Sequence, residues 1–235
     1  MILLPFCIGI LLRISNLTSC RRQAKGEDVE KGCKLDNMIP TPRTSWFQEP
    51  VAARVAESTY VSPTATILGD VEIGEDVYVA PAVSIRGDEG TPIHIGDKTN
   101  VQDGVIMHGL LHQWVRVEGR DYAIYVGDEV CCAHGAIIHG PCVVGDNTFI
   151  GFNAVIFKAE VGRDCAVLHN AVVTGGVKVP DGRMVPIASI VDTQAKADAL
   201  PSISEDLRSL KEEVVEVNIE FARGYKKKVL LGDRA

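Results

Sequence analysis

The sequence predicts a mainly β fold, a parallel β-helix of hexapeptide repeats with a C-terminal α-helix packed alongside. Aliphatic residues recur every six residues in several runs between Val55 and Val191. A helix of 3.6 residues per turn cannot place such residues on one stripe, whereas short strands joined by tight turns can. Aromatic residues make up only 6% of the chain, which suits thin, regularly stacked coils. After Pro201 the apolar spacing changes to that of an amphipathic helix.

The N-terminal residues predict a leader (1–20) followed by a flexible linker (21–45). The apolar run 1–12 is shorter than the roughly 20 residues that span a membrane, and its length matches the apolar section of a secretory signal. The stretch from Leu17 to Cys20 resembles a lipobox, which precedes a lipid-modified cysteine. We expect an extracytoplasmic or lipid-anchored protein if this leader is functional, and a cytoplasmic one otherwise. The linker is polar and charged, as flexible segments are.

Residues 46–192 are expected to form the β-helix, with three hexapeptides in each coil and two loops, 86–94 and 108–125, that bulge from a corner. This phase gives one column of stacked aliphatic residues, five of which are followed by a glycine. We expect those glycines to occupy turn positions with positive φ. The column comprises Ile73, Ile95, Val126, Val144, Val161 and Val179.

A second column contains Ile85, Met107 and Ile138, and the residues that follow them are Arg86, His108 and His139. A residue next to an inward aliphatic side chain points outward in a strand, and stacked strands lie about 4.8 Å apart. His108 should therefore lie directly above His139, close enough for both imidazoles to bind one metal ion.

His134 is expected on the adjacent face of the coil, from which it cannot easily reach the same ion. A second copy of the chain, rotated by about 120°, could supply it across an interface. The sequence thus predicts a homotrimer with three equal clefts. Three histidines with an open fourth position are typical of a catalytic zinc site.

The C-terminal segment 193–225 is expected to contain an amphipathic helix of roughly five turns that lies along one face of the β-helix. Gly224 is expected to end it, and residues 226–235 form a tail of unassigned structure. The predicted apolar face consists of Leu207, Leu210, Val214, Val217, Asn218 and Phe221.

Charge and cysteine spacing argue against several classes of site. The net charge is -7, and the one basic cluster is Lys226 to Lys228, so a nucleic-acid surface is not expected. The seven cysteines show no CxxC spacing, which argues against a zinc knuckle or a thioredoxin-type site. We expect Cys131 and Cys132 to point to opposite faces of a strand and to act as small apolar side chains.

Four motifs together resemble the gamma-class carbonic anhydrases: Arg86 to Gly90, Asn100 to Gly104, His108-Gly109, and Ala133 to Pro141. The resemblance covers roughly Trp46 to Tyr225. It implies a left-handed β-helix, a homotrimer, and reversible hydration of CO2 to bicarbonate by a metal-bound hydroxide at the trimer interfaces. The implied cofactor is Zn²⁺, with Fe²⁺ or Co²⁺ as alternatives.

The resemblance also implies a role for each site residue. The metal ligands are His108, His134 and His139. Glu89 assists proton removal, and Arg86 pairs with Asp88 at the subunit boundary. The remaining implied site residues contact the bound hydroxide, bicarbonate or CO2, and they are Gln102, Asn100 and Asn218.

One loop departs from the family pattern. Well-characterised members carry an extended acidic loop after the first histidine, with a glutamate that shuttles protons. Here the loop from Gly109 to Arg120 is short, and His112 is the candidate proton relay in it, with an exposed loop histidine as the alternative.

Two other functions remain open from the sequence. The chain could be a hexapeptide-repeat acyltransferase, a class that needs no stacked pair of histidines. It could also be a non-catalytic β-helix scaffold or a bicarbonate-binding protein, because the acidic loop is missing. The expected small-molecule partners are CO2 and bicarbonate, and a membrane is expected only through the N-terminal lipid anchor.

Overall fold

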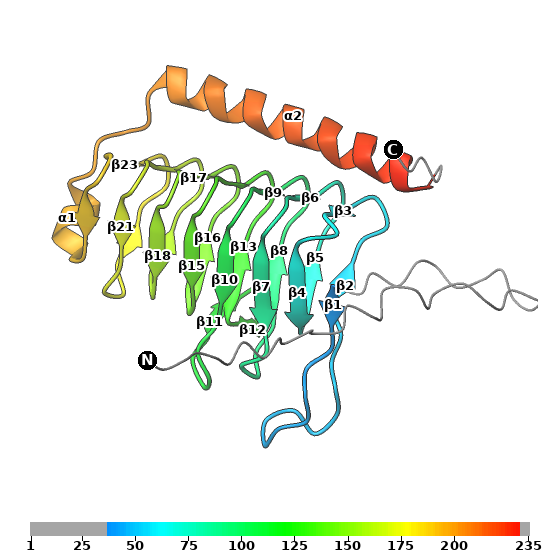
Figure 1. Cartoon of the computed structure of the whole chain (residues 1–235). Coiled ribbons are helices and arrows are strands. Elements are labelled where there is room, and N and C mark those ends of the chain that lie inside the picture. The colour runs from blue at the N-terminus through cyan, green and yellow to red at the C-terminus, as the bar shows by residue number, and fades with distance from the viewer. Residues whose placement is uncertain (1–36, 231–235) are drawn as a thin grey trace, which may run out of the picture. The chain divides into compact units, whose positions relative to one another are not determined.

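The computed structural model describes residues 37–230, which form a β-helix of about eight coils with three parallel sheets (Figure 1). Sheet A contains β1 (Met38–Ile39), β4 (Thr66–Gly69), β7 (Ser84–Gly87), β10 (Ile106–His108), β15 (Ile137–His139), β18 (Val155–Phe157), β21 (Val172–Val173) and β24 (Ile190–Val191). Sheet B contains β2 (Arg54–Val55), β5 (Val71–Ile73), β8 (Ile93–Ile95), β13 (Ile124–Val126), β16 (Cys142–Val144), β19 (Glu160–Val161) and β22 (Lys178–Val179). Sheet C contains β3 (Tyr60–Val61), β6 (Tyr78–Val79), β9 (Asn100–Val101), β14 (Cys131–Cys132), β17 (Phe149–Ile150), β20 (Ala166–Val167) and β23 (Met184–Val185).

Both predicted columns are present, each in a single sheet. In sheet B, Ile73 is in register with Ile95, which is in register with Val126. In sheet A, Ile85 pairs with Met107, which pairs with Ile138. These side chains are buried in the interior of the coil, where close packing of aliphatic groups stabilises the fold.

The glycines after the sheet B column are required for a different reason from the predicted one. The left-handed backbone lies two residues later in the turn, for example at Glu129, with a φ of 55°. At Gly127 a Cβ atom would overlap the carboxylate of Asp146 on the next coil. That carboxylate accepts the backbone N–H of Asp128 at 3.0 Å, so close approach of the coils excludes a side chain there.

The folded part begins earlier than expected. Strand β1 pairs with β4, and the side chain of Asn37 donates to the carbonyl oxygens of Ser62 and Ala65. These residues fall in the stretch 21–45, so the prediction of a flexible linker is wrong for its end. The expected leader with Cys20 lies outside the described residues.

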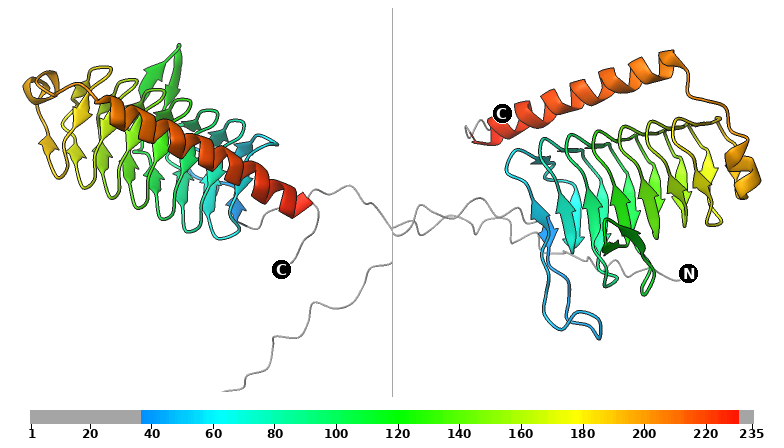
Figure 2. Two further views of the ribbon diagram at one scale, coloured as in Figure 1. Left: turned by 90° about the horizontal axis from the view of Figure 1, so that it is seen from above. Right: turned by 180° about the vertical axis from the view of Figure 1, so that it is seen from behind.

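The loop predicted at 108–125 contains an antiparallel hairpin. Its strands are β11 (Val115–Val117) and β12 (Arg120–Tyr122), and Val115 lies opposite Tyr122. Glu118 and Gly119 form the turn, with φ values of 50° and 83°. The hairpin projects from a corner of the β-helix (Figures 1 and 2).

Two helices follow the last coil, α1 (Gln194–Asp198) and α2 (Glu205–Leu230). Helix α2 runs back along sheet C, as predicted, but it continues past Gly224 (Figure 2). The ring of Tyr225 stacks on Tyr60 at 5.0 Å, and Lys226 Nζ donates to the Thr59 carbonyl at 3.2 Å. These contacts favour helix beyond the glycine, so the predicted end at Gly224 and the start of a tail at residue 226 are wrong.

The face of α2 that is buried also differs from the predicted one. Lys211, Val215, Asn218 and Ala222 are the buried residues of the helix. Lys211 Nζ donates to the Asn147 carbonyl at 2.5 Å, which turns this side of the helix toward sheet C. Of the predicted apolar face, Asn218 is buried, whereas Leu210, Val217 and Phe221 are exposed.

Four cysteines in the described part of the chain are free thiols and fully buried: Cys131, Cys132, Cys142 and Cys165. Burial raises the pKa of the Cys142 thiol to about 11. Burial also raises the pKa of the other three thiols, so all four are protonated at neutral pH. Cys132 packs in the hydrophobic core, as predicted, whereas Cys131 lies outside that core and its Sγ accepts a hydrogen bond from Gln102 Nε2 at 3.6 Å. Between residues 37 and 230 no helix is long and apolar enough to cross a membrane.

Candidate active site

Two of the three predicted ligands meet at the corner between sheets A and B. His108 ends β10 and His139 ends β15, and the two residues are in register, as the six-residue count predicts. Their ring centroids are 5.2 Å apart and the rings are perpendicular. Arg86 lies one coil away in the same column.

Carboxylates face the His108 ring from the loop after β7. Asp88 Oδ1 lies 3.2 Å and Glu89 Oε1 lies 3.5 Å from His108 Nε2. Asp88 Oδ2 also accepts a hydrogen bond from Arg86 Nη2 at 2.9 Å, so Arg86 and Asp88 form an ion pair. Because Arg86 compensates the charge of Asp88, Glu89 supplies the carboxylate charge beside the imidazoles that favours a cation.

The loop that carries these carboxylates is held from two distant parts of the chain. Trp46 Nε1 donates to the Asp88 carbonyl at 2.9 Å. Gly90, with a φ of 83°, faces the side chains of Trp46 and Leu111. The position of Glu89 therefore depends on residues about 40 positions before it and on the loop that follows His108.

His139 has the protonation state that a metal ligand needs. Burial lowers the pKa of this imidazole, so it is neutral at pH 7. Its Nδ1 atom is buried without a hydrogen-bond partner among the described residues. A buried polar atom without a partner is uncommon and is one sign of a bound ion.

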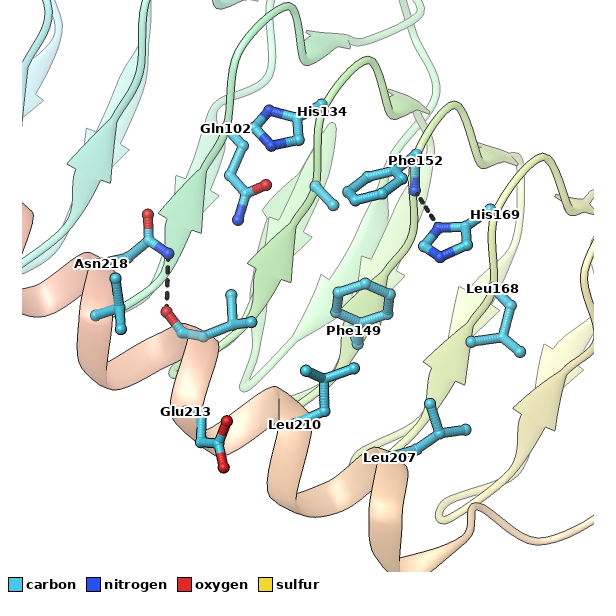
Figure 3. Close-up of a pocket in the computed structure, with 13 residues that line it drawn as sticks. Gln102, His134, Phe149, Phe152, Leu168, His169, Leu207, Leu210, Glu213 and Asn218 are labelled. Carbon is cyan, nitrogen blue, oxygen red and sulfur yellow. Dashed lines mark hydrogen bonds between the residues drawn. The ribbon is translucent and has the colours of Figure 1, made fainter.

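Gln102, His134 and Asn218 lie elsewhere, in a pocket of about 460 Å³ between sheet C and α2 (Figure 3). Gln102 Nε2 donates to Asn100 Oδ1 at 3.1 Å, and both side chains are buried. Asn218 Nδ2 donates to the Val214 carbonyl at 2.8 Å. Three predicted polar side chains thus line one pocket, and Asn100 supports one of them.

His134 lies at the corner between sheets C and A, so the width of sheet A separates it from His108 and His139. Its Nδ1 is 3.1 Å from Asp103 Oδ2, and its side chain is 55% exposed. Within residues 37–230 of one chain, no group of three or more His, Cys, Asp or Glu side chains could hold a metal ion. One chain therefore brings two predicted ligands together and leaves the third apart.

His112 lies in the exposed turn that precedes the hairpin, with a φ of 60°.

Several pocket residues escaped the sequence analysis. Phe152 and His169 occupy the turn position of His134 on the next two coils, and the six-residue count could have found them. Phe149 and Leu168 also line the pocket and were not predicted. The remaining apolar lining residues are Ala133 and four members of the predicted helix face, Leu207, Leu210, Val214 and Val217.

Comparison with curated proteins identifies the family, although no protein-family model matches the chain. The carbonic anhydrase of Methanosarcina thermophila is 40% identical over 224 residues, which cover 89% of this chain and 90% of that protein. The chain belongs to the gamma-class carbonic anhydrases. A mitochondrial gamma carbonic anhydrase of Arabidopsis thaliana is 31% identical over 131 residues, covering 55% of this chain and 46% of that protein.

This gamma-class chain is also related to a protein with an assembly role. The carboxysome assembly protein CcmM of a Nostoc species is 43% identical over 185 residues, which cover 78% of this chain and 33% of CcmM. The chain therefore spans about a third of that longer relative.

Solved structures support the fold of this gamma-class chain. A putative acetyltransferase from Bacillus cereus matches with a TM-score of 0.64 and 24% identity, covering 81% of this chain and 98% of that one. A hexapeptide transferase family protein from Anaplasma phagocytophilum matches with a TM-score of 0.61 and 23% identity, covering 74% and 93%. The predicted hexapeptide-repeat β-helix is confirmed.

Proposed function

We propose that the protein catalyses the reversible hydration of CO2 to bicarbonate, at metal sites shared between neighbouring copies of a homotrimer. The observation that carries the reaction is the 40% identity with a carbonic anhydrase along nearly the full length of both chains. The separation of His134 from the stacked pair His108 and His139 supports sharing between copies.

The residues fit a divalent metal ion. Neutral imidazoles are ligands for Zn²⁺, and Fe²⁺ or Co²⁺ would also accept them. His108 and His139 of one copy would bind it together with His134 of the next copy. In His134 the contact with Asp103 engages Nδ1, which leaves Nε2 for the metal. A zinc ion held in this way would lower the pKa of bound water to about 7.

The chain's own side chains would transfer the proton and orient the substrate. Glu89 lies beside His108, and its carboxylate would accept the proton that the reaction releases. Gln102, with Asn100 fixing its amide, and Asn218 would orient CO2 or bicarbonate in the pocket. His112 remains a candidate to pass the proton to solvent, because an imidazole titrates near neutral pH.

Two apolar surfaces support the proposed trimer. The outer face of sheet A carries an aliphatic stripe across five coils, beside His108 and His139. The pocket beside His134 is lined mainly by apolar side chains. Burying such a stripe in such a groove on a neighbouring copy would stabilise the assembly and bring the two parts of the site together. The stripe consists of Ile106, Ile137, Val155, Val172 and Ile190.

The deciding experiment is a stopped-flow CO2 hydration assay on anaerobically purified protein of known metal content. We expect about one metal ion per chain and turnover that a chelator removes and added Zn²⁺ or Fe²⁺ restores. Metal-loaded trimers that do not hydrate CO2 would contradict the proposal.

A non-catalytic role is the second candidate, and the 43% identity with CcmM favours it. A scaffold or bicarbonate-binding protein would bind bicarbonate, detectable by calorimetry, without turnover in the same preparation. Acyl transfer has weaker support, because the transferase-like structures are less than 25% identical and indicate the fold alone. Binding of acetyl-coenzyme A by the metal-free protein would support the acyltransferase alternative.

A further inference from the structure

A column of rings connects His134 to a histidine two coils away. His134, Phe152 and His169 each lie two residues after the inward residue of a sheet C strand, and those inward residues, Cys132, Ile150 and Val167, are in register. The three side chains therefore project from the same corner on successive coils, about 4.8 Å apart. They line the same pocket (Figure 3).

His169 fixes Phe152 by two contacts. The backbone N–H of Phe152 donates to His169 Nδ1 at 2.9 Å. Because a backbone N–H can only donate, Nδ1 must be unprotonated, and the neutral ring carries its hydrogen on Nε2. The two rings also stack, with centroids 4.3 Å apart and planes 17° apart.

Phe152 in turn packs against His134. The ring centroids are 5.4 Å apart, and the planes are inclined by 38°. Asp103 contacts His134 from the preceding coil, with Oδ2 3.1 Å from Nδ1. The imidazole of His134 thus lies between a carboxylate on one side and a ring on the other. Since that ring is held by His169, rotation of His134 away from its position is restricted.

We propose that His169 is a positioning residue for the shared metal site: acting through Phe152, it holds His134 in the orientation needed to reach a metal ion on the neighbouring copy. This inference rests on the proposed function. Residues that orient metal ligands typically change metal affinity by about 10- to 100-fold when they are replaced.

Three substitutions of His169 test its hydrogen bond with Phe152 and its stacking on Phe152 separately. His169→Ala removes both of them. His169→Asn keeps an acceptor for the Phe152 N–H and loses the stacking, whereas His169→Phe keeps the stacking and loses the acceptor. Ile187→Ala is the matched control, because Ile187 occupies the same turn position one coil further from His134.

The measurements are Co²⁺ affinity by competition with a chelator, the visible spectrum of the Co²⁺ protein, and molar mass by light scattering. We expect trimeric H169A to bind Co²⁺ about 10- to 100-fold more weakly than wild type and to show an altered spectrum. The Co²⁺ affinities of H169N and H169F should lie between those of wild type and H169A. The affinity and spectrum of I187A should match wild type.

Wild-type affinity and spectrum in trimeric H169A would overturn the inference. If H169A does not form trimers, H169N and H169F decide: wild-type affinity and spectrum in both would overturn the inference, and a loss in either would support it. The proposed function fails separately, if the wild-type protein itself binds no metal or is not a trimer.

Discussion

At the scale of single residues, the proposed role of Glu89 as a proton acceptor depends on where its carboxylate lies. Its carboxylate lies 3.5 Å from His108 Nε2 on a loop that is held by the hydrogen bond from Trp46 to Asp88. Glu89→Gln keeps the shape of the side chain and removes the base. We expect turnover to fall by about 100-fold or more, since general base catalysis contributes roughly 10²- to 10⁴-fold, while metal content stays at the wild-type level.

The check on Glu89 is stopped-flow turnover together with metal analysis of the same sample. Loss of metal from E89Q would show that Glu89 supports the ligands instead of moving a proton. Restoration of turnover by a small exogenous base such as imidazole would identify the missing group as a proton acceptor.

The six-residue count predicts His108 and His139 directly, whereas Asp88 and Glu89 are expected from the family resemblance alone, for a physical reason. His108 and His139 are related by register alone, so counting in steps of six places one above the other. The carboxylates of Asp88 and Glu89 lie in a loop outside the repeat, and their directions depend on Trp46 and Leu111. Contacts between segments so far apart in sequence are not visible in a periodic pattern.

At the scale of elements, the hairpin β11–β12 is fixed to the β-helix by Arg120. Its guanidinium donates to both carboxylate oxygens of Glu72 at 2.5 and 3.0 Å, and lies over the Tyr122 ring at 5.0 Å. Arg120→Ala should release the hairpin. Because an exposed ion pair contributes about 0.2–1 kcal/mol, we expect Tm to fall by no more than about 4 °C.

The sharper measurement for Arg120 is the rate of trypsin cleavage at Arg116 in the hairpin, which should rise in R120A. Arg163→Ala removes a comparable ion pair with Asp181 on another turn and serves as the control. Equal cleavage rates in the two variants would show that Arg120 does not hold the hairpin.

Helix α2 is tied to the early coils by the ion pair between Arg223 and Asp76, with Nη2 and Oδ2 2.6 Å apart. The hydrogen bond from Arg223 lowers the pKa of Asp76 below its usual 3.8. A depressed carboxyl pKa stabilises the fold above pH 3.8, and this contribution is lost as the pH falls through the folded-state value. Arg223→Ala should therefore lower Tm slightly at pH 7, and this difference should shrink as the pH falls below 3.8. A difference that persists at low pH would contradict this account.

The elements also show where local sequence signals fail. Gly224 is a good helix terminator by itself, but the stacking of Tyr225 on Tyr60 continues the helix beyond it. The alternation of Val115, Val117 and Tyr122 around Glu118-Gly119 is a hairpin signal. It lies in a segment that interrupts the repeat, so the six-residue count does not reveal it.

At the scale of the whole molecule, each proposed active site needs residues from two neighbouring chains, so activity depends on which chains are adjacent. Chains carrying His108→Ala and chains carrying His134→Ala should each form inactive trimers without bound metal. In a mixed trimer, one interface of the three combines an intact pair His108 and His139 with an intact His134. Mixed trimers isolated through two different tags that do not bind metal should therefore recover about one third of wild-type metal content and turnover.

Mixed trimers of H108A and H139A chains are the matched control. Both variants damage the same part of the site, so no interface in such a trimer is complete. Recovery in this control, or none in the first mixture, would contradict sites shared between copies.

Helix α2 has one further consequence for how the molecule unfolds. In a stack in which each coil contacts only its neighbours, the coils at either end could unfold independently of those at the other end. Helix α2 leaves the last coil and returns to the first ones, where Lys226 donates to Thr59, 167 residues away. Loosening at one end is thereby transmitted to the other. The helix changes a one-dimensional array into a closed, cooperative unit.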